Sequence, residues 1–169
     1  IRLSLVGSEM CIRDRSGKDD CIQCPEATFQ PNEGSRSPSD CLLCPPGTFM
    51  GDKGSTQCEP CPPGYFTGSA GATLCEPCPY GTFASGPGTS ECTPCPEGTF
   101  MPETGASSVE ECVPCGQGYF SNTTGALKCR PCPRGTYSSG AVSSECTPCP
   151  PGTYGTEEGL QNRTQCTLC

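Results

Sequence analysis

The chain has 169 residues, of which 19 are Cys, 22 Gly and 20 Pro, and its formal net charge is −8. Cysteine, at about 11% of the chain, exceeds the level that marks a disulfide scaffold, and the large aliphatic residues are too few for a conventional core. This composition excludes Rossmann folds, TIM barrels and helical bundles. The lack of His removes the commonest general base, and the acidic balance argues against a nucleic-acid partner.

The first fifteen residues, IRLSLVGSEMCIRDR, share no pattern with the rest of the chain. Their apolar run is too short for the core of a signal peptide. The stretch resembles a translated sequencing-adapter read-through, so we predict that residues 1–15 are non-native and that Cys11 has no biological role. Residues 16–23 then form a partial repeat, and we interpret the chain as an internal fragment of a longer protein.

Nine C-x-x-C pairs occur after these residues, spaced 17 or 20 residues apart, and they contain every cysteine except Cys11. The second cysteine of each pair opens a new repeat. The predicted repeats, numbered 1 to 8, are 24–43, 44–60, 61–77, 78–94, 95–114, 115–131, 132–148 and 149–169.

Each repeat opens with a variant of C-P-x-G-T-[FY], as in CPPGTF at 44–49. Pro makes the chain leave the cysteine extended, the following Gly suits a turn with positive φ, and Thr-Phe predicts a short strand. A second Gly, usually ten residues after the opening cysteine, predicts a loop tip. It is found at Gly34, Gly54, Gly71, Gly88, Gly105, Gly125 and Gly159.

The predicted fold class is therefore small disulfide-rich repeats made of short β-hairpins and turns, with no substantial helix. Eight such repeats in tandem predict an elongated rod of about 100 Å. Three places depart from the pattern: Ala27 replaces the turn Gly, Gly116-Gln117 replaces Pro-x, and in repeat 7 the second Gly comes early, at Gly140.

One aromatic residue stands five positions after each opening cysteine. We expect these side chains to be structural, packing over a disulfide or on the aromatic residue of the next repeat; an exposed ligand-binding ladder is the alternative. The eight residues are Phe29, Phe49, Phe66, Phe83, Phe100, Phe120, Tyr137 and Tyr154.

Three chemistries compete for the cysteines. Zinc sites need four thiolates each, but nine pairs do not divide evenly into such sites, and the neighbouring residues are mostly neutral or acidic. A redox-active C-x-x-C needs a lowered thiol pKa, usually at a helix N-terminus, and no such helix is predicted. Structural disulfides are favoured, and they imply an oxidising compartment.

The pairing of the cysteines has two candidate schemes. In a ladder, each repeat closes on itself, and every loop adds about 3 kcal/mol by restricting the unfolded chain. A crossed scheme would instead join first to first and second to second, for example Cys41–Cys58 with Cys44–Cys61. The favoured ladder leaves Cys21 and Cys169 unpaired and comprises Cys24–Cys41, Cys44–Cys58, Cys61–Cys75, Cys78–Cys92, Cys95–Cys112, Cys115–Cys129, Cys132–Cys146 and Cys149–Cys166.

Two glycosylation sequons occur, at Asn122-Thr123-Thr124 and Asn162-Arg163-Thr164, and both fall in the loop half of a repeat. We predict that Asn122 and Asn162 carry glycans. No EF-hand-type calcium loop is present in the sequence, and we predict no metal and no cofactor.

The string C-x-P-C-P-x-G-T-[FY] resembles the ephrin-receptor-like cysteine-rich repeat and is similar to the cysteine-rich units of the tumour-necrosis-factor receptor family. The resemblance covers residues 21–169. It implies an extracellular rod of disulfide-closed units, of the kind found in receptor ectodomains, in which the opening cysteine, Gly and aromatic residue are structural. Ala27 and Gly116-Gln117 depart from the family pattern.

From these features we predict a non-enzymatic extracellular segment of a larger surface or secreted protein. It would act as a rigid spacer and as a stalk that binds a protein ligand. Its partners would be that ligand or neighbouring domains, with no nucleic acid and no membrane span within residues 1–169. An intracellular zinc-binding interaction protein using tandem C-x-x-C pairs is the alternative.

Overall fold

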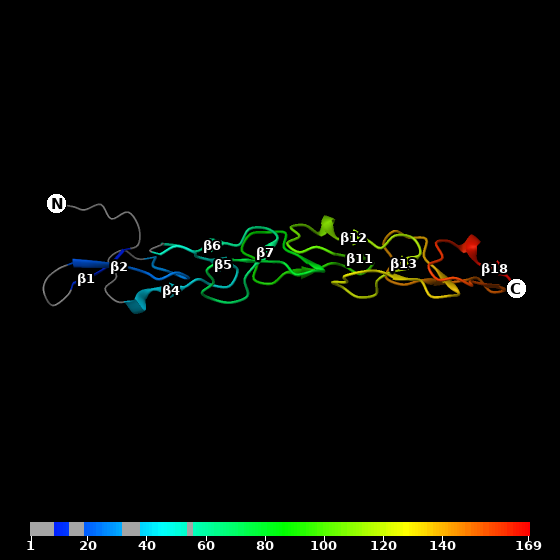
Figure 1. Cartoon of the computed structure of the whole chain (residues 1–169), viewed down its shortest axis with the longest axis horizontal. Coiled ribbons are helices and arrows are strands. Elements are labelled where there is room, and N and C mark those ends of the chain that lie inside the picture. The colour runs from blue at the N-terminus through cyan, green and yellow to red at the C-terminus, as the bar shows by residue number, and fades with distance from the viewer. Residues whose placement is uncertain (1–8, 14–18, 32–37, 54–55) are drawn as a thin grey trace. The chain divides into compact units, whose positions relative to one another are not determined.

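A computed structural model describes residues 9–13, 19–31, 38–53 and 56–169. Their contacts divide them into two bodies. The N-terminal body runs to Pro77 and includes Gly86–Glu91, and the C-terminal body comprises Cys78–Ser85 and Cys92–Cys169. Both bodies consist of short antiparallel strand pairs (Figure 1). No helix in the described part of the chain is long and apolar enough to cross a membrane.

Each repeat is a hairpin between its Thr-Phe-type dipeptide and the two residues inside the next C-x-x-C. The C-x-x-C dipeptide is therefore a strand as well as a link, since its backbone groups need partners. The pairs are β3 (Thr28–Phe29) with β4 (Leu42–Leu43), β5 (Thr48–Phe49) with β6 (Glu59–Pro60), β7 (Tyr65–Phe66) with β8 (Glu76–Pro77), β9 (Thr82–Phe83) with β10 (Thr93–Pro94), β11 (Thr99–Phe100) with β12 (Val113–Pro114), β13 (Tyr119–Phe120) with β14 (Arg130–Pro131), β15 (Thr136–Tyr137) with β16 (Thr147–Pro148), and β17 (Thr153–Tyr154) with β18 (Thr167–Leu168).

A longer strand pair precedes the repeats. β1 (Glu9–Arg13) pairs antiparallel with β2 (Asp19–Gln23), and the register sets Cys11 opposite Cys21. The side chains of these strands lie outside the described residues, and so do the loop glycines Gly34 and Gly54. The non-native origin of residues 1–15 and the unpaired state of Cys21 stay predictions.

The turn after each opening cysteine has the same form in regular and irregular repeats. In repeat 2 the Thr48 N–H and hydroxyl both donate to the Pro45 carbonyl, at 3.1 and 2.8 Å, and Gly47 has φ +83°. Ala27 adopts φ +67° and keeps this turn despite its Cβ. In repeat 6 Gly118 has φ +81° and closes the turn, while Gly116 has φ +80°, which proline could not adopt.

Loop length differs among the repeats in one defined way. The disulfides of repeats 1, 5 and 8 span 17 residues and those of the others span 14. In each longer loop a single 3-10 turn stands just before the closing cysteine: η1 (Pro38–Asp40), η2 (Val109–Glu111) and η3 (Arg163–Gln165). The additional length is therefore taken up locally.

Successive repeats are joined by backbone hydrogen bonds. Between repeats 5 and 6, Gly98 N–H donates to the Ser121 carbonyl at 2.8 Å and Met101 N–H donates to the Ala126 carbonyl at 3.0 Å. Gly125 N–H donates back to the carbonyl of Cys95 at 2.8 Å. The second Gly, which the sequence placed at a loop tip, is therefore an inter-repeat contact, because its positive φ turns its N–H toward the preceding repeat.

Repeats two apart also touch within each body. A Cβ added at Gly81 of repeat 4 would lie 2.2 Å from the Gly125 carbonyl oxygen of repeat 6. The same approach joins Gly47 to Gly88 in the N-terminal body, also at 2.2 Å. The turn Gly thus serves two purposes, a left-handed φ and a close backbone approach.

The buried interior of the described residues is small, and its most deeply buried side chains are cysteines. Six of the opening cysteines are fully buried. The next most buried position is the residue after the aromatic one, which the repeat pattern of the sequence does not single out. It is occupied by Gln30, Met50, Thr67, Ala84, Met101, Ser121 and Ser138.

Candidate functional site

The covalent framework is a ladder of eight disulfides, with Cα–Cα separations between 5.5 and 5.9 Å. Each bond joins the opening cysteine of a repeat to the first cysteine of the next pair. Among the cysteines whose side chains are described, Cys169 alone is free, and it is exposed. The bonded pairs are Cys24–Cys41, Cys44–Cys58, Cys61–Cys75, Cys78–Cys92, Cys95–Cys112, Cys115–Cys129, Cys132–Cys146 and Cys149–Cys166.

This bonding bears on the zinc alternative. Zinc binds thiolates, and a sulfur in a disulfide is not one. Within the described residues no three His, Cys, Asp or Glu side chains gather as a metal site requires. The structure therefore does not favour zinc.

The aromatic residues of the repeats differ in burial. Phe83 is buried in a cluster with Met101 and with Cys95 and Cys112, the disulfide of the next repeat. The other aromatic residues of this position are half-buried, except Tyr154, which is 45% exposed. The aromatic residue of a repeat therefore mostly covers the buried cysteines and is seldom fully buried itself.

The two sequon asparagines are both exposed. Asn162 is the N-cap of η3, and its side-chain oxygen accepts from Thr164 N–H at 3.1 Å and from the Thr164 hydroxyl. These bonds use the Oδ1 atom and leave Nδ2, the atom that a glycan would occupy, pointing to no protein partner. Asn122 lies in the loop of repeat 6, directly after the buried Ser121.

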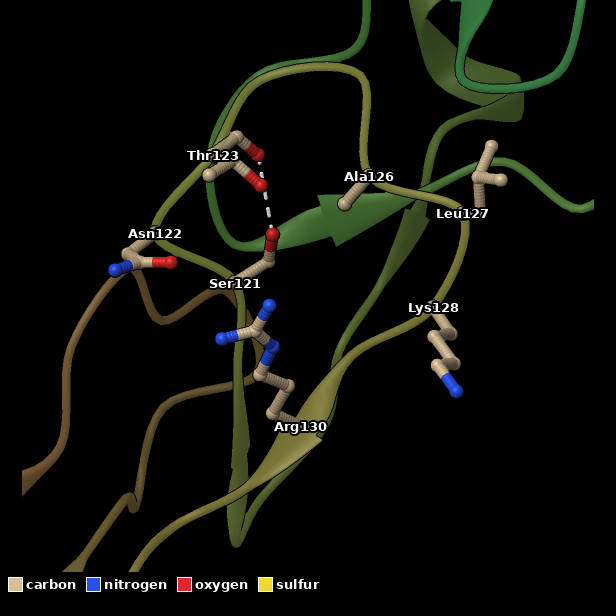
Figure 2. Close-up of a pocket in the computed structure, with 7 residues that line it drawn as sticks. All are labelled: Ser121, Asn122, Thr123, Ala126, Leu127, Lys128 and Arg130. Atoms are coloured by element: carbon tan, nitrogen blue, oxygen red, sulfur yellow. Dashed lines mark hydrogen bonds between the residues drawn. The ribbon is translucent and has the colours of Figure 1, made fainter.

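A shallow hollow of about 180 Å³ is formed inside the loop of repeat 6 (Figure 2). Its polar wall includes Ser121, whose hydroxyl donates to the Thr123 carbonyl at 3.1 Å. The Arg130 side chain, on β14, extends toward Ser121 and Asn122 (Figure 2). Lys128 lies on the segment of the loop that returns to β14, and its side chain points away from these two residues (Figure 2). The lining residues are Ser121, Asn122, Thr123, Ala126, Leu127, Lys128 and Arg130.

Repeat 3 has an equivalent hollow of about 590 Å³ in its own loop. Leu74 and Glu76, which flank Cys75, line this hollow. They correspond in the repeat to Lys128 and Arg130, which flank Cys129. The same loop frame therefore carries opposite charge in the two repeats.

The longer loop of repeat 5 holds one carboxylate in a defined place. The Ser107 backbone N–H and hydroxyl donate to Glu111 at 2.8 and 2.9 Å. The first of these bonds, followed by the second, lowers the pKa of Glu111 below its usual value. Ser108 caps the same turn by accepting from Glu110 N–H.

Comparison with known families identifies the repeats. The model of the family described as tyrosine-protein kinase ephrin type A/B receptor-like matches residues 39–74, 71–112, 108–137 and 116–166. The chain belongs to this ephrin-receptor-like family. No curated protein gives a match.

Membership of the ephrin-receptor-like family fits the geometry of the repeats. The matched segments overlap along tandem disulfide-closed repeats, as the sequence pattern predicted. The family is one of receptor cysteine-rich repeats and is not a catalytic one. Together with the eight disulfides, it points to an extracellular domain.

Proposed function

We propose that this ephrin-receptor-like chain is a non-catalytic extracellular segment of a larger surface or secreted protein and acts as a rigid spacer. The observation that carries the proposal is the way in which consecutive repeats are fastened. A disulfide closes every repeat, and backbone hydrogen bonds join each repeat to the next within a body. The contacts between repeats two apart oppose bending at the junctions.

The spacer role predicts a length for the segment. At roughly 12–15 Å for each repeat, eight repeats would hold neighbouring domains about 100 Å apart. Small-angle X-ray scattering of the oxidised, purified chain measures this length. We expect a rod-like pair-distance distribution with a maximum near that value, and a compact distribution would contradict the spacer function.

Reduction provides the matched control for this measurement. Without its disulfides the chain lacks the apolar core that would keep it folded. Reduced and alkylated protein should scatter as an expanded coil, and retention of the same profile would remove the basis of the proposal.

A protein ligand is the second part of the proposal. Exposed aromatic side chains such as Tyr65 and Tyr119, which are 41% and 44% exposed, are the residue type enriched at protein interfaces. A ligand recovered by proximity labelling on cells should lose binding when both are replaced by Ser. Unchanged binding would show that these two tyrosines do not form the ligand-binding surface, and recovery of no ligand would leave the segment a spacer alone.

We also propose the ladder pairing and the use of both sequons in the secreted protein. Non-reducing peptide mapping should join one peptide pair for each disulfide, whereas the crossed scheme would join the same two peptides twice. Asn122→Gln and Asn162→Gln should each remove one glycan mass from protein made in secretory cells, and an unchanged mass would exclude that site.

A further inference from the structure

Charge is distributed very unevenly along the chain. Residues 112–144 contain no Asp or Glu, although the chain has 18 acidic residues, and they contain Lys128, Arg130 and Arg134 of the ten cationic ones. Repeat 6 and most of repeat 7, up to Ser144, therefore form a cationic stretch within an acidic chain. At physiological ionic strength charges are screened over about 8 Å, so a local cluster acts despite the net charge of −8.

Two of these cations occupy positions that are never cationic in the other repeats. Lys128 precedes and Arg130 follows the first cysteine of a C-x-x-C pair. In the other repeats the preceding residues are Asp40, Gln57, Leu74, Glu91, Glu111, Glu145 and Gln165, and the following ones are Leu42, Glu59, Glu76, Thr93, Val113, Thr147 and Thr167. The pair is thus peculiar to repeat 6 and is not required by the fold.

The cations are also uncompensated. Within the described part of the chain, no hydrogen bond or ion pair engages the side chain of Lys128, Arg130 or Arg134. Lys128 and Arg130 line the same hollow, whose wall also includes Asn122, a side chain with an amide N–H₂ donor. A guanidinium beside a neutral amide donor suits a sulfate or carboxylate on a sugar.

We propose that the hollow of repeat 6 binds a sulfated polysaccharide. Arg130 holds one anionic group of the polysaccharide inside the hollow, and Lys128 contacts a second anionic group farther along the polysaccharide. The arrangement favours a polymer over a single anion, because the two side chains point to different sides of the loop (Figure 2). The proposal goes beyond the spacer role and rests on the extracellular location, where such polymers are found.

The polymer's path is restricted on one side. A neighbouring hollow of about 360 Å³ shares Asn122 with this one but is lined by Glu97 and Glu145. These carboxylates repel an anionic chain, so it should leave the hollow on the Lys128 side. A glycan on Asn122 would occupy the boundary between the two hollows and compete for the same space.

The test uses the oxidised full-length chain, made in secretory cells, with heparin as the probe. Lys128→Gln with Arg130→Gln should weaken heparin binding about tenfold or more and lower the NaCl concentration of elution. The control, Lys53→Gln with Arg163→Gln, removes the same two charges elsewhere and should elute like the parent chain. Equal loss in both variants, or no loss in the first, would overturn the proposal.

Three further measurements define the ligand and the site. In parent chain whose mass shows a glycan on Asn122, Asn122→Gln should bind heparin more tightly, and an unchanged affinity would place the site outside the hollow. Leu74→Lys with Glu76→Arg should create a second heparin site in repeat 3. Equally tight binding of polyglutamate or single-stranded DNA would show a general polyanion patch and overturn the saccharide assignment. None of these outcomes alters the scattering profile, so failure here is distinct from failure of the spacer role.

Discussion

Two junctions of the C-terminal body achieve the same bonding with different residues. Between repeats 5 and 6 the third inter-repeat hydrogen bond runs from Gly125 N–H to the Cys95 carbonyl, at 2.8 Å. Between repeats 6 and 7 the corresponding residue is Val142 in place of Gly, and the bond runs instead from Gly116 N–H to the Ala141 carbonyl, also at 2.8 Å. Two of the three irregularities of the sequence, Gly116-Gln117 and the missing second Gly of repeat 7, therefore meet at one junction.

The difference shows that what the repeat preserves is the number of backbone bonds, not the residue at each position. A proline at position 116 has no N–H to donate, so the loss of Pro and the loss of the second Gly compensate each other. Departures that look independent in the sequence are coupled in space.

The largest expected effect concerns the turn glycines. Gly118→Ala would place a Cβ 2.3 Å from the Gly159 carbonyl oxygen, in addition to requiring a left-handed φ. We expect a loss of about 3 kcal/mol or more in the free energy of unfolding, measured by denaturant titration of the oxidised protein.

The matched control for that change is Gly135→Ala. Gly135 has φ +78°, but nothing lies within 4 Å of an added Cβ, so only the conformational cost of about 1 kcal/mol should remain. Equal losses at both glycines would mean that contacts between repeats two apart contribute nothing.

A smaller effect is expected when the regular motif is restored at the irregular junction. Gly116→Pro removes the bond to Ala141 and cannot adopt φ +80°, so the change should destabilise the protein by about 2–3 kcal/mol. Hydrogen exchange should rise at repeats 6 and 7. Gly116→Ala, which keeps the N–H and meets no atom, should cost only about 1 kcal/mol. A stabilising Gly116→Pro would refute the compensation.

Ala27→Gly tests an irregularity that has no partner. The turn at Ala27 keeps φ +67°, so removing its Cβ relieves a local strain, partly offset by the greater freedom of Gly in the unfolded chain. We expect a gain of about 0.5–1 kcal/mol, visible as a higher melting temperature. A loss would indicate that the Ala27 methyl group packs well enough to outweigh the strain.

The smallest effect concerns the long loop of repeat 5, on the regular side of the comparison. Because Ser107 lowers the pKa of Glu111, the stabilisation from this contact is present above the usual carboxyl pKa and is lost as pH falls through the lowered value. Ser107→Ala should raise the pKa of Glu111 in an NMR titration toward its ordinary value. Ser69→Ala, in the loop of repeat 3, serves as the control and should leave it unchanged.

Parts of the candidate site could be predicted from the sequence and parts could not. The repeat pattern predicted the family and the short hairpins, since Cys, Pro and Gly at fixed spacing dictate turns and strands locally. The buried position after the aromatic residue was missed because Gln30, Met50 and Ser121 share no chemistry. The cationic stretch of residues 112–144 can be read from the sequence, but it was missed because only the net charge of the whole chain, −8, was considered.

The sequence by itself determined which residues turn, which Thr-Phe-type dipeptides form strands and where cysteines recur, because each of these depends on neighbours within one repeat. Only the tertiary structure decided which N–H meets which carbonyl in the next repeat, why Gly81 must lie against Gly125, and which side chains surround the hollow of repeat 6. Those relations join residues as many as 44 positions apart, and no local pattern in the chain encodes such a distance.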